Sequence, residues 1–143
     1  MVFETTIKYL RKRSKNPIKV ENSRDVYNFL KPLYKENMNY QEEMRAVFFD
    51  TANQVICVTT LGIGCVNSCV SNNQKLYQTA ILSNCKGVVI AHNHPSGNLK
   101  PSEADIKLTK EIQEALKLFR IVLMDHLILT ENDYESLADK GYL

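Results

Sequence analysis

One stretch decides the fold of this chain: His92-Asn93-His94-Pro95-Ser96-Gly97-Asn98-Leu99-Lys100-Pro101-Ser102-Glu103-Ala104-Asp105. It follows directly on an apolar run at 87–91. Pro95 cannot donate to a sheet ladder and favours the end of a strand, and residues 96–98 supply turn chemistry. The order therefore predicts a buried strand that ends in two histidines, then a loop, then a helix with polar residues on its first turn.

The spacing within this stretch points to a metal site. Side chains two residues apart in an extended segment point to the same side, so His92 and His94 can present two imidazoles to one ion. Asp105 lies three residues after Ser102, which places both on the first helical turn. Two imidazoles and one carboxylate suit Zn²⁺, and three protein ligands leave a fourth position open for water. The alternative for Ser102 and Asp105 is a helix-capping pair.

The pattern H-x-H-P-x6-S-x-x-D resembles the JAMM (MPN-plus) metal signature, and its detail, H-N-H-P-S-G followed by P-S-x-x-D, resembles the RadC family. Residues 42–50 resemble that family's acidic residue followed by an apolar strand ending in Asp. Residues 64–67 resemble its Gly-Thr-x-Asn turn, and residues 125–128 resemble its Asp-His-x-Ile strand. The similarity covers the chain from about Ser23 to its last residue.

The resemblance implies a zinc-dependent hydrolase of the JAMM type, a metallopeptidase or isopeptidase that uses a metal-bound water on a peptide or protein substrate. It implies that His92, His94 and Asp105 hold one Zn²⁺. It also implies that Glu42 acts as general acid/base and that Ser102 helps to stabilise the oxyanion. These roles agree with general chemistry, because a carboxylate can move the proton of an activated water and a hydroxyl can stabilise a tetrahedral oxyanion.

Glu42 has a neighbour of the same type, Glu43, which we expect to point to the opposite face. The alternative for this pair is two solvated acids at the start of a strand. After the Gly-Thr-x-Asn turn the family usually shows Pro-Arg-Glu, whereas this chain has Asn72-Asn73-Gln74, so the Arg and Glu charges of the family pattern are absent.

A second class of function stays open: a RadC-type DNA repair-associated protein that acts by nucleic-acid or protein binding without peptidase turnover. Residues 1–20 carry a charge balance of +5, which suits either a phosphate-contacting patch or a solvated strand edge protected by charge. We expect no N-terminal helical DNA-binding module, because the catalytic-type domain takes nearly the whole chain. A nucleobase deaminase is excluded, because its H-x-E and P-C-x-x-C motifs are absent.

The composition bears on the number of domains, the class of partner and the cellular compartment that we expect. The chain has 143 residues and ordinary apolar and charged fractions, which is typical of one globular domain. The net charge of +2 favours no class of partner. No signal peptide or membrane-spanning run is visible, and no C-x-x-C pair occurs among Cys57, Cys65, Cys69 and Cys85. We therefore expect a cytoplasmic protein with reduced thiols.

The fold predicted is α/β, a single-domain mixed sheet flanked by helices, and the resemblance implies a JAMM-like (cytidine-deaminase-like) form of it. We predict a basic N-terminal strand and turn over 1–22 and a RadC-like JAMM metal-hydrolase domain over 23–143. Strands are expected at 2–10, 45–50, 54–60, 87–91 and 120–130, helices at 23–33, 74–85, 102–118 and 133–140, and a short strand or turn at 62–70. His126 is expected to be a hydrogen-bonded core histidine, with contact to the metal site as the alternative.

Overall fold

The computed structural model describes residues 2–6, 8, 14–64 and 71–143. Within them lies a five-stranded mixed sheet with the order β2-β1-β3-β4-β5. Strands β3 and β4 are parallel, and the other neighbouring pairs are antiparallel. The strands are β1 (Glu43–Phe49), β2 (Val55–Ile63), β3 (Gly87–Asn93), β4 (Val122–Leu129) and β5 (Tyr134–Ser136).

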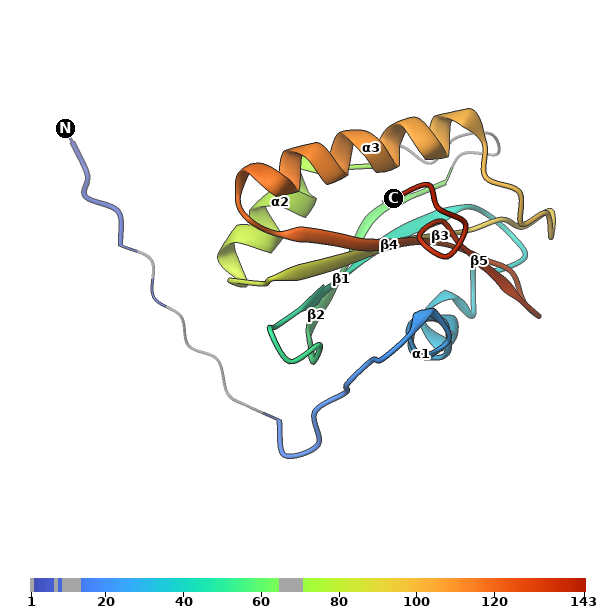
Figure 1. The fold of residues 1–143 in the computed structure, drawn as a ribbon, viewed down its shortest axis with the longest axis horizontal. Helices are drawn as coiled ribbons and strands as arrows, with labels where there is room; N and C mark the ends of the chain where they lie inside the picture. The colour runs from blue at the N-terminus through green and yellow to red at the C-terminus, as the bar shows by residue number, and fades with distance from the viewer. Residues whose placement is uncertain (1, 7, 9–13, 65–70) are drawn as a thin grey trace.

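Helices cover both faces of the sheet. Helices α2 (Asn73–Leu82) and α3 (Glu103–Leu118) lie over one face, whereas α1 (Ser23–Leu30) and the 3₁₀ turn η1 (Lys31–Tyr34) lie on the other (Figure 1). Because side chains alternate along a strand, the two faces carry two separate apolar cores. The core beneath α2 and α3 includes Phe48 and Ile90, and the core beside α1 includes Phe49 and Val89.

The crossover from β3 through α3 to β4 positions the candidate site. Parallel strands require such a crossover, and it brings the carboxyl ends of β3 and β4 to the same edge of the sheet, beside the start of α3 (Figure 1). Strand β1 runs antiparallel to β3, with Met44 opposite His92. The beginning of β1 therefore lies at this same edge.

Most of the predicted elements are present, with shifted ends. Strand β2 runs on to Ile63 and β3 includes His92 and Asn93, beyond the predicted limits. We expect Ser23 to cap the helix predicted at 23–33, but the cap of α1 is Asn22, whose side chain accepts a hydrogen bond from the Asp25 N–H. Pro32 lies in η1, where the α-helical pattern changes to a 3₁₀ turn.

Two predicted elements are wrong. Residues 2–6 and 8 form no strand, and Val2 and Phe3 are 98% and 78% exposed, because no strand among the described residues pairs with them. The predicted helix at 133–140 is replaced by β5 and a following turn. Pairing of Tyr134–Ser136 with the edge of β4 satisfies their backbone groups and buries Leu137, which the local sequence pattern could not show.

Some of the predictions concern residues that the structure describes only in part. Of the Gly-Thr-x-Asn-like turn at 64–67 only Gly64 is described, and the rest of that turn, the end of the segment at 62–70, Cys65 and Cys69 lie outside the described residues. Cys57 and Cys85 are thiols and not disulfides. No helix in the described part of the chain is long and apolar enough to span a bilayer.

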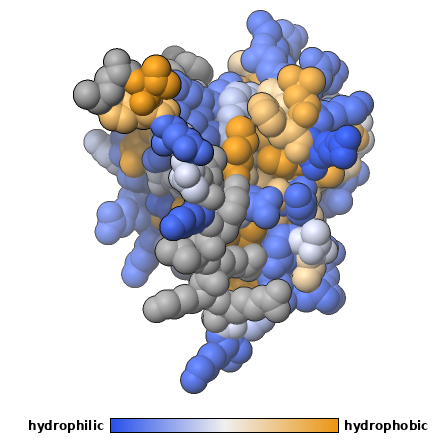
Figure 2. Space-filling model, turned by 90° about the vertical axis from the view of Figure 1, so that its left-hand side faces the viewer, coloured by the Kyte–Doolittle hydropathy of each residue, from blue (hydrophilic) through white to orange (hydrophobic). Residues whose placement is uncertain are grey.

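The end of the sheet at which β3 and β4 begin carries exposed apolar side chains at the ends of α2 and α3 and the start of β4, among them Leu82, Leu118 and Val122. Figure 2 views the molecule from this side and shows apolar residues interspersed among hydrophilic ones.

Candidate metal centre

The structure brings together the three residues predicted as metal ligands. His92 Nε2 lies 2.9 Å from His94 Nε2 and 3.3 Å from an Asp105 carboxylate oxygen. The other Asp105 oxygen lies 3.8 Å from His94 Nε2. His92 is buried within β3, and His94 and Asp105 are partly buried. The extended backbone through 92–94 and the first turn of α3 thus aim three donor groups at one point.

The spacing of these donors fits one small divalent ion. Zinc binds imidazole nitrogen and carboxylate oxygen at about 2.0–2.2 Å, so two ligands of a tetrahedral ion stand about 3.3 Å apart. The two Nε2 atoms are 2.9 Å apart, and each lies 3.3 or 3.8 Å from its nearer Asp105 oxygen, so these distances are close to that value. A His-His-Asp group of this size is therefore compatible with a metal site.

The loop after β3 fixes the ring of His94. Its Nδ1 lies within hydrogen-bond distance of the Asn98 carbonyl oxygen, which can only accept, so Nδ1 carries the proton. The loop closes through a bond from the Gly97 N–H to the His94 carbonyl, with Gly97 at a φ of +79° that favours glycine. The other ring nitrogen of His94, Nε2, is therefore the one that faces His92 and Asp105.

Asp105 serves two purposes at once. One of its oxygens accepts a hydrogen bond from the Ser102 N–H at 2.8 Å, and the Ser102 Oγ accepts from the Asp105 N–H at 3.1 Å. This is the capping box expected as the alternative, and it begins α3. The other oxygen faces His92. Burial would raise the pKa of Asp105, but the hydrogen bond and charge of His92, with the bonds from Ser102, hold that pKa well below its ordinary value.

His126 lies behind His92 on the neighbouring strand. It is fully buried, and its Nε2 lies 2.8 Å from His92 Nδ1. Its Nδ1 lies 2.6 Å from the hydroxyl of Thr109 on α3. Burial, with the neighbouring His92, lowers the pKa of His126 well below its ordinary value, so its ring is neutral at pH 7. His126 is thus a hydrogen-bonded core histidine that also contacts a predicted ligand.

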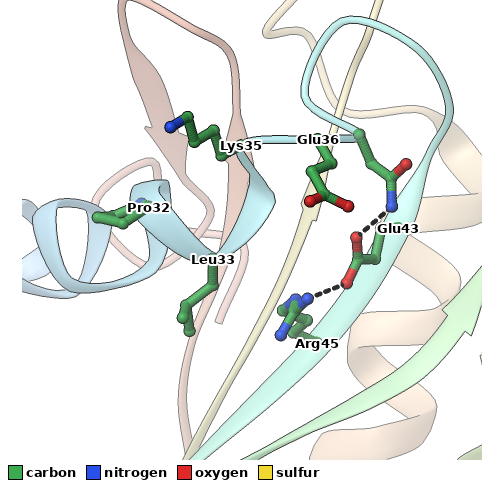
Figure 3. A pocket seen from close by; sticks show the side chains of 7 residues that line it. Pro32, Leu33, Lys35, Glu36, Glu43 and Arg45 are labelled. Atoms are coloured by element: carbon green, nitrogen blue, oxygen red, sulfur yellow. Dashed lines mark hydrogen bonds and ion pairs between the residues drawn. The ribbon is translucent and has the colours of Figure 1, made fainter.

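The two neighbouring glutamates differ in position. Glu43 points to the α1 face, where it is buried, forms an ion pair with Arg45 and accepts a hydrogen bond from Asn37 (Figure 3). Glu42 directly precedes β1, and strand alternation places it on the face of Met44, the residue opposite His92. The role of Glu42 as acid/base stays a prediction.

Asn93 is a residue whose role the sequence argument missed. It stands between the two histidines but points to the other face and is fully buried. Its Oδ1 accepts from the Glu43 N–H, and its Nδ2 donates to the carbonyls of Asn37, Met38 and Gln41. It therefore fastens the segment that carries Glu42 to the end of β3. A lone amide inside an apolar strand was the available signal.

The departure at Asn72-Asn73-Gln74 has a local structural use. The Asn72 side chain accepts a hydrogen bond from the Lys75 N–H and caps α2. This cap agrees with the strong preference for Asn at the residue that precedes a helix.

Comparison with known proteins shows to which family the chain belongs. Residues 20–142 match a family model described as RadC-like JAB domain. The chain is 32% identical over 125 residues to a UPF0758 protein of Methanococcoides burtonii, and 37% identical over 131 residues to one of Clostridium botulinum. The alignments cover 87% and 90% of this chain but 54% and 56% of those relatives, so it spans about half their length. The chain belongs to the family of RadC-like JAB domains.

Proposed function

We propose that this domain is a zinc-dependent hydrolase of the JAMM type that cleaves a peptide or isopeptide bond in a peptide or protein substrate. The observation that carries the proposal is the convergence of the His92, His94 and Asp105 donor atoms at spacings suited to one ion. Nε2 of each histidine and the Asp105 carboxylate would hold Zn²⁺. A bound zinc ion lowers the pKa of a coordinated water to about 7, which supplies hydroxide near neutral pH.

Glu42 is assigned the proton transfer. A carboxylate on the His92 face at the start of β1 can accept a proton from the attacking water and deliver it to the leaving amine. The bonds that Asn93 makes to Gln41 and Glu43 hold the backbone on both sides of Glu42. The register of β1 against β3 supports this assignment over Glu43, which is engaged on the opposite face.

Ser102 is assigned to the oxyanion. Its Oγ accepts the hydrogen bond from the Asp105 N–H, which leaves the hydroxyl proton to be donated elsewhere. A hydroxyl donor next to the ion would stabilise negative charge as it develops on the carbonyl oxygen.

Metal analysis tests the site directly. The purified wild-type protein is expected to retain about one zinc ion per chain, and His94→Ala is expected to lose it. Lys100→Ala, an exposed change in the same loop, is the matched control and should keep the ion. Stoichiometric zinc that persists in His94→Ala would contradict the ligand assignment.

Turnover is tested with fluorogenic peptides and an isopeptide-linked lysine substrate. Cleavage should stop on addition of a chelator and return when zinc is restored, and Glu42→Gln should lose cleavage while keeping zinc. Salt-dependent binding of mixed-sequence DNA, with no chelator-sensitive cleavage of either substrate, would instead favour the DNA-associated function.

A further inference from the structure

A continuous chain of hydrogen bonds runs behind the candidate metal centre. It begins at His92 Nδ1 on β3, passes through His126 on β4, and reaches the Thr109 hydroxyl on α3. The Thr109 Oγ1 is also 2.6 Å from the carbonyl oxygen of Asp105. All of the side chains involved are buried, so water does not compete for these bonds.

The last bond in the chain sets the direction of all the others. A carbonyl oxygen can only accept, so the Thr109 hydroxyl donates its single proton to Asp105. The Thr109 oxygen must then accept from His126, which places the His126 proton on Nδ1. With the His126 proton on Nδ1, Nε2 of that ring is left as an acceptor for the Nδ1–H of His92. With that proton on Nδ1, Nε2 of His92 is the ring nitrogen that faces His94 and Asp105 and that can bind a metal ion.

We propose that Thr109 and His126 are positioning residues that fix the His92 ring in its Nδ1–H tautomer, so that Nε2 is held ready for the metal ion. This inference rests on the proposed metal site. Partners of this kind behind a ligating histidine set its tautomer and orientation, and their loss usually costs about 10- to 100-fold in metal affinity. Neither residue is predicted to touch the ion.

The chain of hydrogen bonds from His92 through His126 to Thr109, here called the relay, also joins two of the three proposed ligands. It starts on the ring of His92 and ends on the backbone carbonyl of Asp105, whose side chain faces His92 from the other side. Its three segments come from β3, β4 and α3, and the two strands are hydrogen-bonded neighbours in the sheet. A change in Thr109 would therefore disturb the separation of the ligands as well as the direction of the His92 ring.

Paired substitutions at Thr109 test the relay through zinc affinity. Thr109→Val keeps the shape but removes the hydroxyl, and should weaken zinc binding about 10- to 100-fold in a chelator-competition titration. Thr109→Ser restores a hydroxyl and should bind within about threefold of wild type. Thr79→Val is the matched control, because Thr79 makes the same bond to the carbonyl four residues earlier, at 2.7 Å, on α2. It should not change zinc affinity.

Nuclear magnetic resonance of the wild-type chain tests the same relay without any variant. Long-range proton–nitrogen correlations on ¹⁵N-labelled protein should show His126 neutral with its proton on Nδ1. The zinc-loaded protein should show His92 with its proton on Nδ1 as well.

These measurements separate the relay from the proposed function. A proton on Nε2 of His126, or wild-type zinc affinity in a folded Thr109→Val protein, would overturn the relay while leaving the metal site intact. Failure of wild type to bind zinc would overturn the metal site, and the His126 tautomer in the metal-free protein would still decide whether the relay has the direction proposed here.

Discussion

The two faces of the sheet at the end of β3 use polar residues in opposite ways. On the α1 face, Asn93 has its amide oxygen and nitrogen engaged by backbone groups of the segment before β1 and of Glu43. On the α3 face, His92 and His94 have one ring nitrogen each engaged and turn the other toward Asp105. Adjacent residues of one strand therefore belong to two different kinds of polar cluster.

The difference shows how a buried polar group can be recognised as structural or functional. Buried polar atoms without partners are costly, so a cluster that exists only for stability is expected to pair donors with acceptors. The Asn93 cluster meets that expectation. In the histidine cluster, two ring nitrogens and a carboxylate oxygen face one another at 2.9 and 3.3 Å, an arrangement that favours a cation or a proton between them.

The largest expected difference between the two faces comes from substituting the neighbouring glutamates Glu42 and Glu43. Glu42→Gln should lower the hydrolysis rate about 10²- to 10⁴-fold, the usual contribution of general acid/base catalysis, with little change in stability. Glu43→Gln should instead lower the free energy of unfolding by about 2–4 kcal/mol, because it breaks a largely buried pair with Arg45. Rate assays and urea unfolding of both proteins measure this. Equal rates in Glu42→Gln and wild type would remove the assignment.

Asp105 should show the next largest effect, because it belongs to both the metal site and the helix cap. Asp105→Asn can keep an oxygen for the Ser102 N–H, yet should weaken zinc binding about 100-fold or more, since a charged ligand is lost. Ser102→Ala should cost about 1 kcal/mol of stability as a lost cap and leave zinc affinity nearly unchanged. Isothermal titration and thermal unfolding distinguish the two, and wild-type affinity in Asp105→Asn would contradict the ligand role.

Asn93→Ala is the corresponding test of the α1 face. The change removes the hydrogen bonds that Asn93 makes to several buried backbone groups, and it should lower the free energy of unfolding by about 2–4 kcal/mol. The folded fraction at low temperature should still bind zinc, because the histidine rings are held from the other face. Loss of zinc binding without loss of stability would show that the two faces are not separate.

A smaller effect is expected from Asp125, the neighbour of His126 on β4. Burial raises the pKa of Asp125, although hydrogen bonds from Ser136, Ala138 and His126 oppose the rise. A carboxyl whose folded-state pKa lies above its unfolded value of about 3.9 favours folding below that pH, and this contribution is lost as pH rises through the folded pKa. As the pH rises from about 4, the free energy of unfolding of metal-free wild type should therefore fall relative to that of Asp125→Asn. A constant difference in urea unfolding would contradict this.

Part of the clustering of His92, His94 and Asp105 could be predicted because the relations within it are local. His92 and His94 share a side through strand alternation, and Ser102 and Asp105 share a helical turn, so spacing alone predicts that the members of each pair lie close together. The contacts of Asn93, Thr109 and His126 join segments that meet only after the sheet has formed, and no local pattern encodes them.

The two wrongly predicted elements, the strand at 2–10 and the helix at 133–140, also depend on pairing with other segments of the sheet. The segment at 133–140 has a composition that suits a helix, but the open edge of β4 made a short strand the better partner for its backbone. Residues 2–6 and 8 show some alternation, but no described strand lies beside them. Local pattern therefore predicted each element correctly only where tertiary pairing agreed with it.

The crossover β3–α3–β4 has a consequence for how this domain can vary. Every group assigned to the cation or to its support, from His92 to His126, is encoded in one uninterrupted length of chain. The carboxylate assigned to proton handling, Glu42, instead lies directly before β1, the first strand of a separate hairpin, β1–β2. Under the proposed function, changes beside that hairpin would abolish turnover without removing zinc, so zinc content alone would not establish activity.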